Sequence, residues 1–292
     1  MFLTIFTPTY NRKETLKRLY NSLCSQTEKD FEWLIVDDGS LDDTECLVKE
    51  WINAGVIKIN YYYQKNAGKA VAHNKGVELS QGELFVCVDS DDELTKNAVT
   101  EIKEAYKSFN DSDIGIIAYK YNTKDNNSVT FIKDVNIKHS TLGDLYNKYG
   151  MTGDTMLVYK SSVIKKYSFP QYAGEKFMPE AYLYDLLDQE GTLYVLRRKL
   201  YGCEYLDNGY TANIARLLYS NPQGYFTYIN QRLSFDRQFK HKLLDSMRYD
   251  AMAIAHKRKN YIREAVYPCI AILALPLGYL FYLKKYKEFT EK

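Results

Sequence analysis

Cysteine is scarce in this chain of 292 residues, and its placement excludes two classes of protein. The cysteines are odd in number, widely scattered and include no CxxC pair: Cys24, Cys46, Cys87, Cys203 and Cys269. This pattern argues against a disulfide framework and against a structural zinc site. It fits free thiols in a reducing compartment, so the expected location is the cytoplasm.

The chain also lacks an excess of one sign of charge. Lys plus Arg number 39 and Asp plus Glu number 37, so the formal net charge is +2. A balance this close gives no general attraction to nucleic acid, and we expect no nucleic-acid partner. The first residues, MFLTIFTPTYNR, lack the basic segment and the small-residue cleavage site of a signal peptide, so we expect them to begin a strand.

Strand and helix patterns alternate through the first hundred residues. Apolar, β-prone runs predict strands at 2–7, 31–36, 57–64 and 84–88, and helical patterns predict helices after residue 11 and over 41–52 and 66–80. Asn11 and Glu14 have the spacing of a capping box, which predicts that the first helix starts there. This alternation predicts an α/β fold with a mostly parallel, doubly wound sheet.

The pattern after residue 92 is less regular. Helical patterns occur over 95–109 and within 175–189, and strand patterns over 114–121, 156–160 and 193–205, so this half is expected to be mixed. The stretch 128–134 is expected to pair with 114–121. The chain from residue 212 onward is helical in pattern. We therefore expect a catalytic domain at 1–211, made of halves 1–110 and 111–211, and a C-terminal helical extension at 212–292.

Carboxylates gather where two predicted strands end. Asp89, Asp91 and Asp92 close the run LFVCVDSDDE, and Asp37 and Asp38 close FEWLIVDDGS. Ligands of open α/β sheets bind outside the carboxyl ends of the strands, so these acids are expected to line one crevice. Such carboxylates suit a hard divalent cation shared with substrate phosphates. The alternative is a solvated strand end with a helix cap.

Four motifs occur in one order: TPTYNR at 7–12, FEWLIVDDGSLDDT at 31–44, NAGKAVAHNKG at 66–76 and LFVCVDSDD at 84–92. In order and spacing they resemble the inverting family 2 glycosyltransferases, including those of bacterial surface and capsular polysaccharides. The resemblance covers the first hundred residues firmly and the next hundred loosely. It implies a GT-A fold, which is a Rossmann-like α/β arrangement.

The resemblance also implies roles for individual residues. Asp38 matches the aspartate that accepts a hydrogen bond from the base, usually uracil, and Asp91 matches the residue that binds metal through the diphosphate. Asp89 matches a residue near the ribose and a second metal ligand, and Asp92 is expected to support the site or cap a helix. The other implied contacts to the nucleotide sugar are Thr7, Pro8, Thr9, Tyr10, Asn66, Gly68, Lys69 and Ser90. The implied cofactor is Mn²⁺ or Mg²⁺, and His73 is expected to be packed or exposed rather than a ligand.

The general base is expected in GEKFMPEAYLYDLLDQ, residues 174–189, where family members carry an acidic motif that opens a helix. The common Glu-Asp doublet is missing, so Glu180, Glu175 and Asp185 all remain candidates. We favour Glu180, which follows Pro179 at the predicted helix start. Asp207 in YLDNGYT could touch the diphosphate, but Asn-Gly there favours a plain turn.

The stretch 265–283 contains no charged residue and is flanked by basic residues on both sides. Its length reaches the lower range of a membrane-spanning helix, and its prolines and glycine favour an interfacial segment drawn to anionic lipids. The alternative is a helix buried in a homo-oligomer interface. We expect peripheral contact with the cytoplasmic face of the inner membrane.

The resemblance implies an inverting, metal-dependent hexosyltransferase. Its donor is expected to be a UDP-sugar and its acceptor a glycan hydroxyl, expected to be linked to polyprenol diphosphate. A metal-dependent nucleotidyltransferase is one alternative, but TPTYNR has no glycine-rich phosphate loop. A non-catalytic protein that binds sugar nucleotides is the other.

Overall fold

The computed structural model describes residues 1–133, 136–204, 210–235 and 238–291. It divides into two compact units. The sheet unit is formed by Met1–Ser168 and Leu183–Tyr205, and the helical unit by Phe169–Tyr182 and Leu206–Lys292. The segment that carries Glu180 therefore belongs to the helical unit, although it precedes the last strand of the sheet in sequence.

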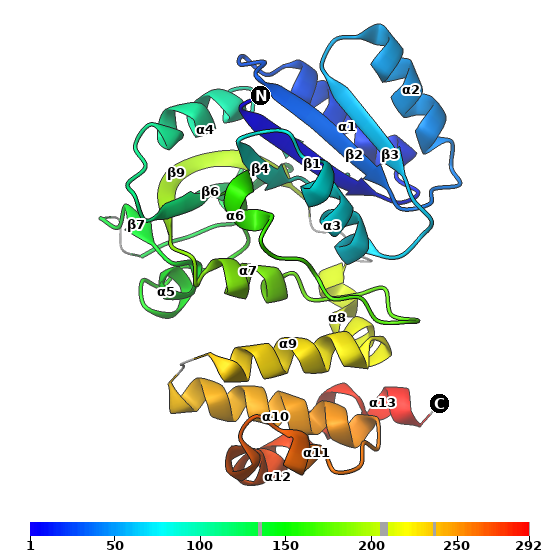
Figure 1. Ribbon diagram of the computed structural model, residues 1–292, viewed down its shortest axis with the longest axis vertical. Coiled ribbons are helices and arrows are strands. Elements are labelled where there is room, and N and C mark those ends of the chain that lie inside the picture. The colour runs from blue at the N-terminus through cyan, green and yellow to red at the C-terminus, as the bar shows by residue number, and fades with distance from the viewer. Residues whose placement is uncertain (134–135, 205–209, 236–237, 292) are drawn as a thin grey trace. The chain divides into compact units, whose positions relative to one another are not determined.

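The first part of the sheet unit follows the expected alternation of strands and helices (Figure 1). Its elements are β1 (Leu3–Thr9), α1 (Lys13–Cys24), β2 (Phe31–Asp37), α2 (Thr44–Ala54), β3 (Ile59–Tyr63), α3 (Lys69–Leu79) and β4 (Leu84–Cys87). β1 pairs in parallel with β2 and with β4, and β2 pairs in parallel with β3. The parallel half of the fold is thus confirmed.

The rest of the sheet unit is mixed, also as expected. Its elements are β5 (Glu93–Leu94), α4 (Ala98–Tyr106), β6 (Asp113–Asn122), β7 (His139–Ser140), α5 (Leu142–Asn147), β8 (Thr155–Lys160), α6 (Ser161–Ile164), α7 (Ala181–Leu187) and β9 (Thr192–Cys203). The sheet order is β3-β2-β1-β4-β8-β6-β9-β5, with β7 also on β9, and β8 is antiparallel to both of its neighbours. Residues 128–134 form no strand within the described part and contact β6 through an isolated bridge at Ser128.

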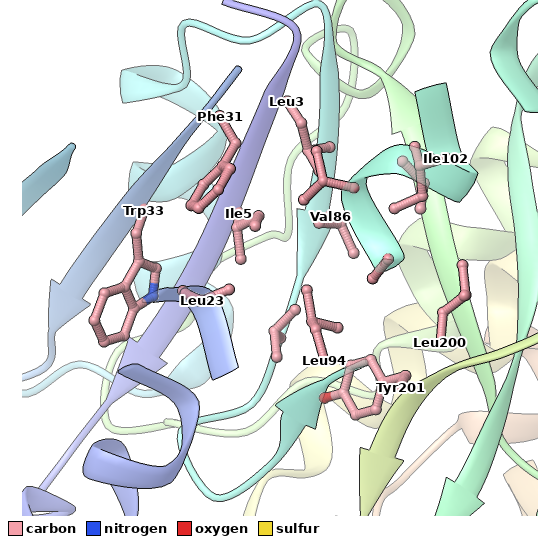
Figure 2. Packing of buried hydrophobic residues seen from close by; sticks show 14 of the residues in the cluster. Leu3, Ile5, Leu23, Phe31, Trp33, Val86, Leu94, Ile102, Leu200 and Tyr201 are labelled. Carbon is pink, nitrogen blue, oxygen red and sulfur yellow. The ribbon is translucent and has the colours of Figure 1, made fainter. Parts of the chain in front are cut away.

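Both faces of the parallel half of the sheet are buried. Successive side chains of a strand point to opposite faces, so each strand contributes to two packed layers. On one face, Leu3, Ile5 and Trp33 pack into one cluster with the buried leucines of α1 (Figure 2). On the other face, the rings of Phe6 and Phe85 each lie 5.5 Å from the ring of His73 in α3. Burial lowers the pKa of His73 to about 3, so it is a packed neutral histidine.

Asn11 does not cap α1, which corrects the capping-box prediction. The helix begins at Lys13, and no side chain caps its N-terminus. Asn11 instead has a positive φ of 52°, accepts a hydrogen bond from the Leu41 amide at 2.8 Å, and donates its own amide to Ser40 at 2.9 Å. The tertiary contact with residues 40–41 is made in place of the local cap because its two hydrogen bonds satisfy four polar groups of two loops.

The helical unit is built from α8 (Tyr210–Ser220), α9 (Pro222–Ser234), α10 (Phe239–Ala255), α11 (Tyr261–Glu264), α12 (Pro268–Lys285) and α13 (Lys287–Thr290). The predicted C-terminal helices are therefore present. In α12, the small residues Ala271, Ala274 and Gly278 are buried, and a Cβ on Gly278 would come within 2.6 Å of the Asp250 Cβ in α10. Helix α12 thus lies against α10 along a narrow strip of small residues.

Candidate active site

Three loops meet at one edge of the sheet because the strands before them are parallel neighbours. Thr9 at the end of β1 lies opposite Asp37 of β2, and Phe6 of β1 lies opposite Cys87 of β4. The carboxyl ends of these strands therefore lead into residues 10–12, 37–40 and 88–92 at the same edge. The polar clusters that the sequence predicted to share a crevice do share this edge.

Residues 89–92 form the acidic turn, and basic side chains surround it. Lys69, the first residue of α3, places its Nζ 2.6 Å from Asp89 Oδ1, and Arg12 Nη1 lies 3.2 Å from Asp91 Oδ2. Burial raises the pKa of Asp89, but the ammonium groups of Lys69 and Lys120 outweigh it and hold that pKa below its ordinary value. The side chains of Asp89 and Asp91 are still 37% and 25% exposed, so solvent reaches both carboxylates although each already faces a positive charge.

Asp92 differs from its two neighbours. It is buried, and burial together with the charge of Asp89 raises its pKa to about 7. Its carboxyl group is hydrogen-bonded to the phenol of Tyr201. Asp92 therefore supports the turn from within, in agreement with the supporting role expected for it.

Asp38 is buried and organises the loop that follows β3. Its carboxylate accepts hydrogen bonds from four donors: Gln64 Nε2 at 2.7 Å, Asn66 Nδ2 at 3.1 Å, and the amides of Ala67 and Gly68 at 2.8 Å each. Two carboxylate oxygens offer about four acceptor positions, so this loop fills the capacity of Asp38. In this structure Asp38 shapes the 64–68 loop, and its expected hydrogen bond to the base of the nucleotide stays a prediction.

Replacing Asp38 with alanine should destabilise the sheet unit. The change leaves buried amide donors without an acceptor, which should cost about 3 kcal/mol of the free energy of unfolding. Chemical denaturation of Asp38→Ala measures this loss, with Asp111→Ala as the control because Asp111 is an exposed aspartate of the same unit. If the two variants unfold at the same denaturant concentration, Asp38 does not organise the loop.

Glycines let the loop at residues 37–40 and the loop at residues 64–68 approach each other closely. Gly39 has a φ of +88°, and a Cβ there would lie 2.9 Å from the Asn66 backbone nitrogen. Gly68 has a φ of +98° and directly precedes α3, which places its amide on Asp38. A side chain at Gly39 would push the loops apart, and the positive φ of Gly68 would strain any other residue, so both positions favour glycine.

The first loop divides its residues between the core and the surface. Thr7 is buried, and its hydroxyl accepts a hydrogen bond from Trp33 Nε1 at 3.0 Å. Its side chain therefore belongs to the core, and its expected contact with the nucleotide sugar stays a prediction. Pro8 and Thr9 are buried, the Thr9 hydroxyl has no hydrogen-bond partner among the described residues, and Tyr10 is 47% exposed. Ser90 is buried within the acidic turn.

Sequence reasoning missed three residues at this edge: Arg12, Lys120 and Tyr201. Arg12 ends the motif TPTYNR, so its position beside the first loop was a signal that could have been used. Lys120 and Tyr201 lie on β6 and β9, which are adjacent in the sheet but 81 positions apart in sequence, as their register shows. No local pattern connects such residues to residues 89–92.

The candidate bases lie in different settings. Glu175 accepts hydrogen bonds from the amides of Gln223 and Gly224, both at 2.8 Å, and so caps the N-terminus of α9. Glu180 is exposed and directly precedes α7. Asp185 lies within α7. The cap assigns Glu175 a structural role and leaves Glu180 and Asp185 as candidates. Asp207 lies outside the described residues.

The acidic turn fits a divalent cation that is shared with a substrate. Among the described residues, no cluster of three or more His, Cys, Asp or Glu side chains could hold a metal on its own. Asp89 and Asp91 nevertheless present partly exposed oxygens within one turn. Mg²⁺ and Mn²⁺ commonly take one or two carboxylates and complete their coordination with phosphate oxygens and water. Asp91 and Asp89 are the residues that would hold such an ion.

Comparisons with known proteins show relatives of this chain and structures that share its fold. A relative from Campylobacter jejuni, GalNAc(5)-diNAcBac-PP-undecaprenol beta-1,3-glucosyltransferase, is 26% identical over 278 residues, which cover 92% of this chain and 86% of that protein. The matches to four other curated relatives span only 16% to 39% of the length of those proteins.

Solved structures share the fold. Staphylococcus aureus TarS 1–349 in complex with UDP-GlcNAc has a TM-score of 0.60 at 17% identity, covering 99% of this chain and 83% of that one. The mannosyltransferase PcManGT from Pyrobaculum calidifontis, in complex with GDP-Man and Mn²⁺, has a TM-score of 0.54 at 16% identity, covering 95% and 73%. Residues 4–169, more than half of the chain, match the family model described as Glycosyl transferase family 2. The chain belongs to glycosyl transferase family 2.

Proposed function

We propose that this protein transfers a sugar from a nucleotide diphosphate donor, a UDP-sugar, to a hydroxyl group of a glycan acceptor. The observation that carries the proposal is the acidic turn, whose Asp89 and Asp91 face Lys69 and Arg12 at the strand edge. Carboxylates and cations interleaved in this way suit a diphosphate that arrives with a divalent cation. The UDP-GlcNAc complex of the TarS fold supports a uridine donor.

The proposed reaction is a single displacement with inversion at the anomeric carbon. The acceptor oxygen forms a bond to that carbon as the bond to the diphosphate oxygen breaks, and the base takes the proton of the hydroxyl group. Lys69 and Arg12 are placed to exchange their carboxylate partners for phosphate oxygens. A divalent cation held by Asp91 and Asp89 would supply a Lewis acid for the charge that develops on the leaving diphosphate.

The resemblance supports Glu180 as the base, and the helix-capping role of Glu175 strengthens this choice. The name of the Campylobacter relative supports an acceptor linked to polyprenol diphosphate.

The proposal is tested by incubating the purified protein with UDP-, GDP- and dTDP-sugars, with Mn²⁺, Mg²⁺ or EDTA, and measuring nucleotide release. We expect metal-dependent release of UDP from one or two donors. If no donor responds in the presence of either metal, the proposed function is wrong.

We also propose that α12 attaches the protein to the cytoplasmic face of the membrane. By length and composition α12 could cross a membrane, with a mean hydropathy of 1.3 and 17% of its residues buried. Its exposed side carries Ile272, Leu273 and Leu280, each about 60% exposed, and Lys284 and Lys285 end it. An exposed apolar face beside basic residues suits an anionic bilayer surface.

Vesicle co-sedimentation should therefore show binding to phosphatidylglycerol vesicles that falls in high salt. The double variant Leu273→Glu/Leu280→Glu should bind at least about tenfold more weakly, because each charge would enter the apolar layer. Leu41→Glu is the control, since Leu41 is an 85% exposed residue of the sheet unit. The alternative is that the wild type does not bind vesicles and that light scattering shows a dimer, which is lost in the double variant. In that case α12 is an oligomer interface instead.

A further inference from the structure

Tyr201 is a buried residue of β9 that holds the acidic turn. The Asp89 amide donates a hydrogen bond to the Tyr201 phenol oxygen at 2.9 Å, and the phenol is also hydrogen-bonded to the Asp92 carboxyl group. The pKa of Tyr201 is raised well above its ordinary value, chiefly by burial, so the phenol keeps its proton. One side chain therefore contacts both ends of the turn that contains Asp91.

An irregularity of β9 places this side chain. Along β6, Ala118, Tyr119 and Lys120 pair with Leu196, Lys199 and Tyr201 in turn, so β9 contains extra residues at this point. Extra residues of this kind bend a strand and redirect its side chains, and they are frequent beside active sites. β5 continues the acidic turn and pairs with the same end of β9, with Leu94 opposite Tyr201 (Figure 2).

Lys120 adds a positive charge from the neighbouring strand. Its Nζ lies 3.9 Å from the centre of the Tyr201 ring. Its charge also lowers the pKa of both Asp89 and Asp92, against the opposing effect of their burial. Lys120 is thus the third cation near the acidic turn, with Lys69 and Arg12, and it approaches from the side of β6.

We propose that Tyr201 and Lys120 are positioning residues for the donor: Tyr201 holds the acidic turn in the orientation that binds a divalent cation, and Lys120 attracts the donor's diphosphate. This inference rests on the proposed function and deepens it. A residue that hydrogen-bonds metal-binding residues typically changes metal affinity by about 10- to 100-fold when it is replaced. The charge of Lys120 acts differently, because a cation repels a metal ion and attracts a diphosphate.

The test measures the binding of Mn²⁺ alone, and of UDP in the presence of Mn²⁺, by calorimetry. Tyr201→Phe keeps the ring and removes the hydroxyl group. It should weaken the binding of Mn²⁺ alone and of UDP with Mn²⁺ by about tenfold or more. Lys120→Met keeps the aliphatic stem and removes the charge, so it should bind Mn²⁺ alone more tightly and UDP more weakly. Tyr249→Phe is the matched control, because Tyr249 is a buried phenol of the helical unit that donates to the Tyr261 carbonyl.

The inference is supported if Lys120→Met changes the affinities for Mn²⁺ and for UDP in opposite directions while Tyr249→Phe keeps the wild-type affinities. A purely structural role would lower the melting temperature of Tyr201→Phe and Tyr249→Phe alike and leave both affinities unchanged, which would overturn it. If Tyr201→Phe does not fold, Lys120→Met decides. The inference is overturned if the affinities of that variant for Mn²⁺ and for UDP stay unchanged or change in the same direction. If the wild-type protein binds neither Mn²⁺ nor UDP, the proposed function itself is refuted. If the wild type binds both and the variants bind them with the same affinities, only the positioning roles are refuted.

Discussion

Replacing Asp91 with asparagine should reduce metal-dependent release of UDP by about a thousandfold. The loss corresponds to the several kcal/mol that a metal ion contributes to the stabilisation of a leaving group, and each 1.36 kcal/mol is about tenfold in rate. The same change should cost less than about 1 kcal/mol of stability. The ion pair of Asp91 with Arg12 is partly solvated, with the two side chains 25% and 41% exposed, so solvent screens it.

Steady-state kinetics and thermal unfolding of one preparation separate these two effects. Chelation by EDTA should bring the wild type down to the rate of Asp91→Asn and leave the variant unchanged. Asp111→Asn serves as the control, since Asp111 is exposed on the same unit. If Asp91→Asn retains more than about a tenth of the wild-type rate, Asp91 does not hold the cation.

Replacing Glu180 with glutamine should lower the turnover number by about 10²- to 10⁴-fold, the usual contribution of a general base. The KM for the donor should change little, because in the proposed mechanism this carboxylate contacts the acceptor and not the nucleotide. Stability should not fall, since Glu180 is exposed. A large loss of turnover with an unchanged melting temperature would identify the base.

Two further variants distinguish the other candidates. Glu175→Gln weakens the cap of α9, so it should lower the melting temperature with little direct effect on turnover. Asp185→Asn should leave turnover within about twofold of the wild type if Glu180 is the base. Should Asp185→Asn lose turnover while Glu180→Gln keeps it, the assignment moves to Asp185.

Local sequence was sufficient to predict much of the sheet unit. β1, β2, β3 and β4 were predictable because each is an apolar, β-prone run bounded by polar turn residues. The shared edge followed from topology, since parallel strands joined by helices bring their carboxyl ends together. Local signals were insufficient at Asn11, whose side chain has two possible partners: the helix start next to it, and the loop at 40–41 that it contacts in the structure. The spacing to Glu14 shows only the first.

The contacts of the Thr7 and Asp38 side chains could not be predicted from local sequence either. Their motifs indicate a nucleotide site, but a motif cannot tell which atoms are already used within the protein. Strand alternation turns Thr7 toward Trp33, and Asp38 is enclosed by the 64–68 loop. Both residues stay at the expected edge, but their contacts depend on neighbours that lie 26 or more positions away in sequence.

The sequence alone determined the family, the α/β class and the place of the acidic turn, because these depend on periodicity and on contiguous motifs. Tertiary structure decided which groups surround that turn. Arg12 ends the first motif, but Lys120 and Tyr201 belong to β6 and β9, and only their pairing in the sheet brings them to Asp89 and Asp92. Charges and hydrogen bonds act over a few ångströms in space, so the electrostatics of this site depend on the fold and not on distance along the chain.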